Sequence, residues 1–320
     1  MTCLLDTGSS DLWIPSKLCK ACKHIEHRFN ANKSSTFLPA LHMTPEGYAP
    51  RAMQISYGSG TILGYEAQDT VTFAGRTIHN QSFLIVEDEL LPENREWDGI
   101  CGFGWDTIAQ MGRPLYSNLQ RMGSKAMYTF VPEDSTSARL YVGPFPQHAV
   151  QPGTVVWTDA EKAFPEGKKT FWFITGGIAV HKKKPHSARF LVDTGTNQVL
   201  LAPRKLYTSI MQSVLPERLY DDLCYELEPV YCDCSILERS RDLPPLRIFI
   251  SGRPFELPVR EMFIPVHREY GQGTNCILAI QPNNINVGDT MPGQSRLPLP
   301  GGLGGILGGL ERKWETVAYS

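Results

Sequence analysis

The stretch CLLDTGSSDLWIPS, residues 3–16, places an aspartate in a run of turn-forming residues between two apolar segments. Asp6, Thr7 and Gly8 form a favourable turn, because an aspartate side chain bonds the backbone that follows it and glycine accepts a positive φ. The apolar flanks predict a strand before the turn and another after it. A single copy of this pattern is most simply structural.

The pattern occurs a second time in FLVDTGTNQVL, residues 190–200, where Asp193 follows Asp6 by 187 residues. Both copies follow an apolar run and precede another, and such an internal repeat predicts two similar lobes. The Pro- and Gly-rich segment at 144–153 is the expected connection, so the lobes are placed at 1–150 and 151–320. An approximate two-fold relation between the lobes brings the two turns face to face.

Two facing carboxyl groups have a defined chemistry. They cannot both ionise comfortably, so they titrate as a pair that shares one proton. The ionised member can take a proton from a water held between them, while the protonated member donates to a carbonyl oxygen. Such a pair hydrolyses an acyl bond without a nucleophilic side chain or a metal.

The composition predicts an all-β protein. Gly and Pro number 28 and 24, apolar residues make up 42% and helix-period segments are few, which favours short strands joined by turns. Strands are expected within 53–65, 69–75, 82–86, 139–145, 154–158, 171–180, 188–195, 198–203, 247–251, 255–259 and 275–280. Short helices are expected at 115–123 and 204–214, and in the second of these Leu206, Ile210 and Val214 fall on one face. A net charge of −2 argues against nucleic acid or an anionic membrane as a partner, and no apolar run is long enough to span a bilayer.

Four segments together resemble one enzyme family. DTGSSDLWIPS, SYGSGTILGYEAQDTV, WDGICGFGW and FLVDTGTNQVL, in this order and spacing, are similar to the pepsin-type aspartic endopeptidases, which include pepsin, cathepsin D and renin. The proton-sharing aspartate pair is the known mechanism of that family. The resemblance implies a bilobal fold of two β-barrel-like lobes related by a pseudo-twofold axis, with a few short helices. It also implies cleavage of peptide bonds between bulky hydrophobic residues at acidic pH. The alternative is a non-catalytic peptide-binding relative of the same fold.

The resemblance assigns roles to the two turns. Asp6 and Asp193 are the implied catalytic pair. The implied supporting residues are Thr7 and Thr194, which cross-brace the turns, Ser9 and Thr196, which bond the outer carboxylate oxygens, and Gly8 and Gly195, which permit close approach. Residues 100–102 and 306–308 match the hydrophobic-hydrophobic-glycine segments that pack behind the first and second aspartate.

The segment YGSG predicts a hairpin that covers the site. It is a hairpin-turn signal between alternating strands, and a glycine-flanked hairpin makes a suitable lid that excludes water. In the family this hairpin is the flap: Tyr57 matches its tyrosine, and Gly58, Ser59 and Gly60 complete the tip. Trp13 matches the tryptophan that supports the tyrosine, although packing as an ordinary core aromatic is its alternative.

Eight cysteines bear on the compartment. Those at 19, 22, 224, 232 and 234 lie in polar, loop-like contexts, which indicates disulfides and an oxidising compartment. Cys3 and Cys101 lie in apolar runs and are expected to be buried free thiols. The sequons at Asn32 and Asn80 agree with passage through the secretory pathway.

The resemblance implies two disulfides, Cys19–Cys22 and Cys234–Cys276, and Cys224–Cys232 is a further candidate. CKACKHIEH, residues 19–27, could instead be interpreted as a zinc site. Its spacing argues against a zinc finger, in which about a dozen residues separate the Cys and His pairs.

The remaining expectations concern partners and location. We expect peptide or protein substrates, no cofactor or metal, no nucleic acid, no membrane span and a monomer. The expected location is the secretory pathway, with a secreted or a lysosomal or vacuolar end point. The family pattern extends beyond both ends of this sequence, so the chain is expected to be truncated at both ends, with a signal peptide and propeptide upstream.

Overall fold

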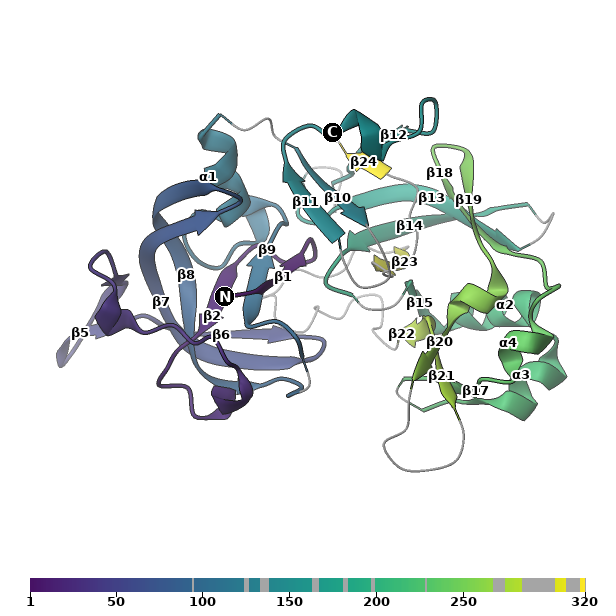
Figure 1. The fold of residues 1–320 in the computed structure, drawn as a ribbon, viewed down its shortest axis with the longest axis horizontal. Coiled ribbons are helices and arrows are strands. Elements are labelled where there is room, and N and C mark those ends of the chain that lie inside the picture. The colour runs from purple at the N-terminus through teal and green to yellow at the C-terminus, as the bar shows by residue number, and fades with distance from the viewer. Residues whose placement is uncertain are drawn as a thin grey trace.

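Strands from the first half of the chain lie on one side of the molecule and strands from the second half on the other (Figure 1). The structure, a computed structural model, describes residues 1–93, 95–123, 127–132, 138–162, 167–180, 184–196, 199–227, 229–266, 274–283, 303–308 and 317–319. Short helices are few beside the strands in these ranges. The expected all-β, two-lobed fold is confirmed.

The first half is built on a seven-stranded sheet. Its strands are β1 (Cys3–Asp6), β2 (Leu12–Pro15), β3 (Leu38–Pro39), β6 (Ala52–Tyr57), β7 (Gly60–Phe73), β8 (Arg76–Leu90) and β9 (Gly99–Gly102). They run in the order β1-β9-β2-β8-β7-β3, and β6 pairs with β7. The predicted strand segments 53–65 and 69–75 are not separated by a break. After the hairpin turn that follows β6, the single strand β7 continues through both segments. Its register with β8 is irregular between Leu63 and Gly64 and between Asp69 and Val71.

The second half is built on another seven-stranded sheet, in the order β19-β18-β13-β14-β23-β15-β22. Its strands are β13 (Phe173–Val180), β14 (His186–Asp193), β15 (Leu200–Pro203), β18 (Leu246–Ile250), β19 (Arg253–Leu257), β22 (Ile280–Asn283) and β23 (Leu303–Gly308). A four-stranded sheet contains β16 (Cys224–Tyr225), β17 (Tyr231–Asp233), β20 (Phe263–Val266) and β21 (Asn275–Leu278). Among the described residues, three two-stranded sheets are also present: β4 (Leu41–Thr44) with β5 (Gly47–Pro50), β10 (Tyr128–Pro132) with β11 (Ala138–Val142), and β12 (Val156–Thr158) with β24 (Val317–Tyr319).

The two large sheets repeat one pairing pattern. β1 runs parallel to β9 with Asp6 opposite Gly102, and β14 runs parallel to β23 with Asp193 opposite Gly308. The strand after each turn, β2 or β15, then pairs antiparallel with the same partner. The internal repeat in the sequence therefore corresponds to a repeated strand arrangement. Each aspartate is the last residue of the strand that precedes its turn.

Helices cover the sheets at a few places. They are α1 (Leu115–Arg121), α2 (Arg204–Val214), α3 (Glu217–Leu223) and α4 (Ile236–Arg239), with 3₁₀ turns η1 (Ala21–His24), η2 (Ala31–Lys33), η3 (Asp106–Ile108), η4 (Gln147–Ala149) and η5 (Val259–Met262). The helices predicted at 115–123 and 204–214 are confirmed. Ile210 and Val214 on α2 are buried in the core of the second half, as their spacing on one face predicts.

The expectation of free thiols at Cys3 and Cys101 is wrong, because the two cysteines form a disulfide with their Cα atoms 5.7 Å apart. Leu5 lies opposite Cys101 in the β1–β9 pairing, and Cys3 shares a face with Leu5, so the two cysteines are diagonal neighbours. The apolar context correctly indicated burial of Cys101. The local sequence around each cysteine gave no indication that these two strands, far apart in sequence, pair with each other.

The other cysteines form three more disulfides, Cys19–Cys22, Cys224–Cys232 and Cys234–Cys276. These are the two pairs implied by the family resemblance and the further candidate. The sulfurs of Cys19 and Cys22 are thus bonded to each other and are not thiolate ligands for zinc.

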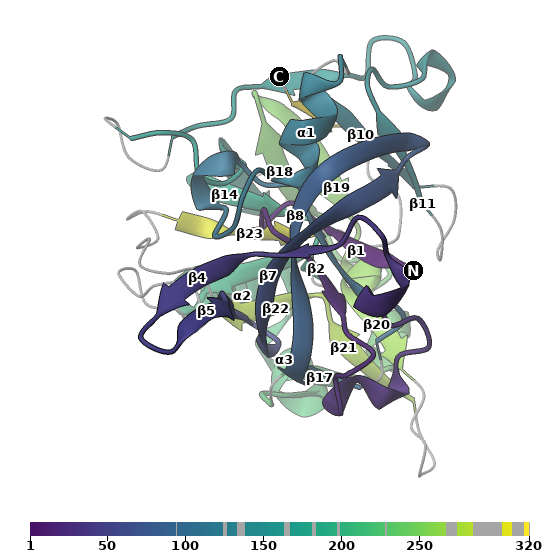
Figure 2. The same ribbon diagram turned by 90° about the vertical axis from the view of Figure 1, so that its left-hand side faces the viewer.

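The β4–β5 hairpin projects from the first-half sheet (Figures 1 and 2). Leu41 and Met43 share one face with Tyr48, which lies opposite Met43, and all three side chains are exposed.

In the part of the chain that the structure describes, no helix has both the length and the apolar character needed to cross a membrane.

Candidate active site

The two DTG turns meet where the first-half and second-half sheets face each other. The amide of Thr7 donates to Thr194 Oγ1 at 3.1 Å, and the amide of Thr194 donates to Thr7 Oγ1 at 2.9 Å. Each hydroxyl also donates to a carbonyl of the opposite half: Thr7 Oγ1 to Val192 at 3.0 Å, and Thr194 Oγ1 to Leu5 at 2.5 Å. Four reciprocal hydrogen bonds therefore fix one turn against the other.

The carboxyl group of Asp6 is held by its own turn. Asp6 Oδ1 accepts from the amide of Gly8 at 2.8 Å, and Oδ2 accepts a short hydrogen bond from the Ser9 hydroxyl. Because the bonds reach both oxygens, the orientation of the carboxyl plane is fixed.

Asp193 is held in the same way. Its Oδ1 accepts from the amide of Gly195 at 2.8 Å, and its Oδ2 accepts from Thr196 Oγ1 at 2.7 Å. Thr196 thus stands where Ser9 stands in the first turn, which gives the site its local two-fold symmetry.

The two glycines allow the aspartates to approach. A Cβ atom on Gly8 would lie 2.7 Å from the carboxyl atoms of Asp193, and one on Gly195 would lie 2.4 Å from Asp6 Oδ1. Real Cβ atoms do not come this close to other heavy atoms. Each turn therefore needs glycine to make room for the aspartate of the other half.

Burial makes this pair electrostatically unusual. Asp6 and Asp193 are only 5% and 9% exposed. Burial, then the neighbouring charge of Asp193 and a hydrogen bond to it, raise the pKa of Asp6 well above its ordinary value. The arrangement therefore favours one proton shared between the two carboxyl groups.

The hairpin of β6 and β7 has Gly58 and Ser59 at its exposed tip and Tyr57 just before it. Tyr57 is half-buried as a whole residue, but its hydroxyl oxygen is fully buried. Burial, followed by the negative charges of Asp6 and Asp11, raises the pKa of Tyr57, which puts the phenol near the first aspartate. Trp13 is fully buried and packs in the same apolar cluster as Tyr57.

The polar atoms of these two aromatics lack a full hydrogen bond. Trp13 Nε1 and the Tyr57 hydroxyl are both buried without a partner at hydrogen-bond distance among the described residues. Trp13 and Ser9 nevertheless lie close enough to lower the pKa of Tyr57, against the larger effect of burial. The two side chains thus pack together in one apolar cluster.

Asp11, between the first turn and β2, was not among the predicted site residues. Its carboxylate accepts from the amides of Gln110 (3.0 Å) and Met111 (3.2 Å). Burial raises its pKa from 3.8 to about 6, and Glu66 acts in the same direction. The sequence feature that could have indicated Asp11 is a charged residue directly before the apolar run LWI.

The residues 87–97, EDELLPENREW, have the polar composition of a loop and gave no signal of their own. They nevertheless supply a buried ion pair, in which Arg95 Nη2 donates to both oxygens of Glu89 at 2.6 and 2.7 Å. The guanidinium group lies over the ring of Trp97, which packs against Trp13.

The histidines of CKACKHIEH have carboxylate neighbours. His24 lies 3.6 Å from Glu89, and His27 lies 3.5 Å from Asp98. Among the described residues, no group of three or more His, Cys, Asp or Glu side chains is arranged to hold a metal.

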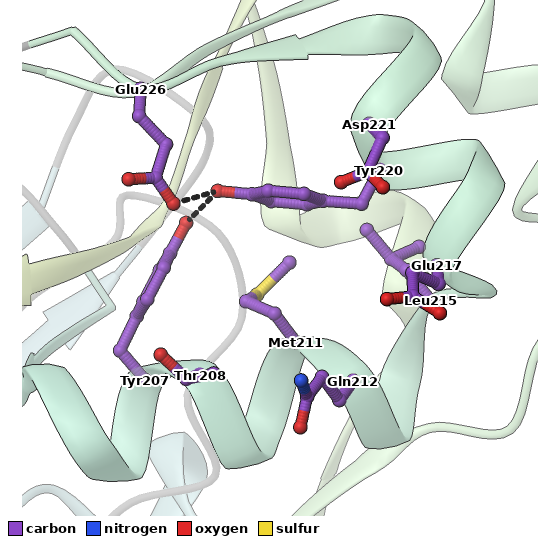
Figure 3. Close-up of a pocket in the computed structure, with 9 residues that line it drawn as sticks. All are labelled: Tyr207, Thr208, Met211, Gln212, Leu215, Glu217, Tyr220, Asp221 and Glu226. Atoms are coloured by element: carbon purple, nitrogen blue, oxygen red, sulfur yellow. Dashed lines mark hydrogen bonds between the residues drawn. The ribbon is translucent and has the colours of Figure 1, made fainter.

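A separate small pocket of about 170 Å³ lies between α2 and α3, and its lining residues include none of the predicted site residues (Figure 3). The Tyr207 and Tyr220 hydroxyls are 2.7 Å apart, and Tyr220 donates to Glu226 at 3.1 Å. These polar groups already bind one another, and the aspartate pair remains the better candidate for chemistry.

Known proteins resemble the chain over most of its length. A family model described as eukaryotic aspartyl protease matches residues 1–291. Cathepsin D of Dictyostelium discoideum is 25% identical over 303 residues, covering 89% of this chain and 72% of that protein. Gastricsin of Macaca fuscata fuscata is 25% identical over 309 residues, covering 90% and 72%. Pepsin A of Suncus murinus is 29% identical over 227 residues, covering 67% and 54%.

Proposed function

Because the chain belongs to the eukaryotic aspartyl protease family, we propose that Asp6 and Asp193 are the catalytic pair with which this aspartic endopeptidase hydrolyses peptide bonds. The observation that carries the proposal is the reciprocal bonding of the two turns, in which the amide of each threonine donates to the hydroxyl of the other. This bonding holds two buried carboxyl groups against each other, an arrangement that is costly without a function.

The raised pKa of Asp6 supports a pair that shares one proton, and the proposed cycle starts with that proton on the Asp6 side. Asp193 accepts a proton from a water held between the carboxyl groups, and the water oxygen attacks the peptide carbonyl carbon. Asp6 gives its proton to the carbonyl oxygen, so the tetrahedral intermediate is neutral.

The intermediate then breaks down by the reverse transfers. Asp193 gives its proton to the amide nitrogen as the C–N bond breaks, and one hydroxyl of the intermediate returns a proton to Asp6 as the carbonyl re-forms. Both aspartates regain their starting states, and the products are a carboxylic acid and an amine. The need for one proton on the pair is the reason to propose an acidic pH range.

We propose that the substrate is an extended peptide chain with bulky hydrophobic residues on either side of the cleaved bond. The flap residues Tyr57, Gly58 and Ser59, supported by Trp13, close over this segment and limit access of water. Backbone hydrogen bonds along an extended peptide supply affinity, and alternate side chains supply specificity.

The disulfides and sequons support a location. Four disulfides among the described residues and exposed sequon residues at Asn32 and Asn80 support the secretory pathway, with a secreted or a lysosomal or vacuolar end point. Both aspartates come from one chain, which supports a monomer whose lobes are 1–150 and 151–320.

The test is cleavage of an unfolded protein at about pH 3–5, where a shared proton is expected. Asp193→Asn and Asp6→Asn should each abolish cleavage, because neither can complete the proton transfers. Asp221→Asn, which changes an exposed aspartate on α3, is the matched control and should cleave at the parent rate. Cleavage by folded Asp193→Asn would falsify the assignment.

A further inference from the structure

A buried ion pair lies behind the flap. The side chains of Arg95 and Glu89 are only 4% and 2% exposed, and one guanidinium nitrogen bonds both carboxylate oxygens. The other terminal nitrogen donates to the carbonyl of Pro92 at 3.1 Å. Such pairs recover little stability over an apolar pair of the same volume, so their position has to be explained by something other than stability.

The arginine end of the pair contacts the aromatic residues that lie under the flap tyrosine. The Arg95 guanidinium carbon lies 5.0 Å from the centre of the Trp97 ring. Trp97 packs edge-on against Trp13, with ring centroids 5.9 Å apart and planes at 73°. Trp13 and Tyr57 belong to the same apolar cluster. A continuous series of contacts therefore runs from Arg95 to Tyr57.

The glutamate end of the pair contacts the flap hairpin through the backbone. Glu89 lies on β8 opposite Ile62 of β7, and Ile62 lies opposite Ile55 of β6. Both isoleucines are buried in the cluster that contains Tyr57. The pair thus joins the end of β8, where it pairs with β7 just after the flap tip, to the aromatic cluster that contains Tyr57.

We propose that Arg95 and Glu89 are positioning residues of the flap, which hold Trp97 and Trp13 where they keep Tyr57 over the substrate. This inference rests on the proposed role of the flap. Glu89 fixes the guanidinium group, the guanidinium group fixes the Trp97 ring, and Trp97 limits the freedom of Trp13. Loss of the pair therefore weakens substrate binding and leaves the aspartates unchanged.

A third titratable group, His24, lies beside the pair. Its Nε2 is 3.6 Å from Glu89 Oε1, and its side chain is 21% exposed. Neutralising Arg95 alone removes the closest compensating cation from a buried carboxylate, which is strongly destabilising. For that reason the decisive variant removes both charges.

The main variant is Glu89→Leu with Arg95→Met, which replaces the pair by apolar groups and is expected to fold. We expect its KM for a peptide substrate to rise about five- to tenfold, the size of couplings between groups in contact, with kcat changed less than about twofold. In a Tyr57→Ala background the same change should raise KM less than about twofold, because the group being positioned is absent. Equal rises of KM in both backgrounds would show that the pair does not act through Tyr57 and would overturn the inference.

Two further variants complete the design. Arg95→Lys keeps a cation beside Glu89 but removes the flat guanidinium group from Trp97, and should raise KM in the same direction. Arg204→Met breaks the exposed pair with Glu226 and should leave KM unchanged. A parent-like KM in folded Glu89→Leu/Arg95→Met, or in Arg95→Lys if the double variant does not fold, overturns the inference. Inactivity of Asp193→Asn in the same assay would show that the proposed function still stands.

Discussion

Asp11 predicts an unusual dependence of stability on pH. The residue is 6% exposed, its carboxylate accepts from the amides of Gln110 and Met111, and burial raises its pKa from 3.8 to about 6. Between these two values the folded chain holds a proton that the unfolded chain has released. Stability from this residue is therefore complete below about pH 3.8 and falls as pH rises through 6.

The size of the effect follows from the two pKa values. A difference of about two corresponds to roughly 3 kcal/mol of free energy of unfolding, lost between about pH 4 and pH 6. Asp11→Asn cannot ionise and should not lose this free energy, although its amide oxygen can still accept one of the two backbone bonds. Its stability relative to the parent should thus rise by roughly 3 kcal/mol from about pH 3.5 to about pH 7.

The assay is urea unfolding with disulfides intact, at several pH values from about 3.5 to about 7, where the difference should develop. Asp193→Asn is placed in both chains to prevent self-digestion, so the raised pKa of Asp6 affects both curves alike and cancels in their difference. Asp221→Asn in the same background controls for the loss of one charge. The difference in unfolding free energy between the Asp11→Asn chain and its parent is then followed with pH. If it stays constant within about 0.5 kcal/mol, the usual scatter of a surface substitution, the reasoning is refuted.

Three other changes test the site and its support. Gly195→Ala should abolish peptide cleavage, because its Cβ would lie 2.4 Å from Asp6 Oδ1; kcat/KM near the parent value would contradict the close packing. Cys3→Ala with Cys101→Ala should lower the free energy of unfolding by about 2–5 kcal/mol, measured in urea, since the bridge joins residues 98 apart in sequence. Thr194→Val should cost about 1–3 kcal/mol by the same measurement, because a buried amide loses its acceptor. Thr194→Ser should cost less, and an equal loss would show that the hydroxyl is not the cause.

The fold class and the aspartate pair could be predicted from the sequence because both rest on local patterns. Strand alternation, the YGSG turn and the apolar face of residues 204–214 are set by neighbouring residues. The pairing of Asp6 with Asp193 is long-range, but the repeated DTG motif carried it. Where a motif is repeated, the repeat indicates an internal symmetry of the fold. That symmetry predicts which residues face each other even when the individual contacts are not known.

Features without a repeated motif could not be predicted in the same way. The Cys3–Cys101 bridge depends on parallel pairing of β1 with β9, which their local sequences do not specify. The Arg95–Glu89 pair places charged side chains in the interior behind the flap, whereas a charged pattern ordinarily indicates a solvated surface. Both depend on contacts between separate elements that composition cannot reveal.

The reciprocal bonds between Thr7 and Thr194 also determine how the two halves can move. These bonds tie the halves together directly beside the two aspartates. A relative displacement of the halves that keeps these bonds therefore has its smallest amplitude at Asp6 and Asp193. The halves can then shift elsewhere without changing the geometry of the two carboxyl groups.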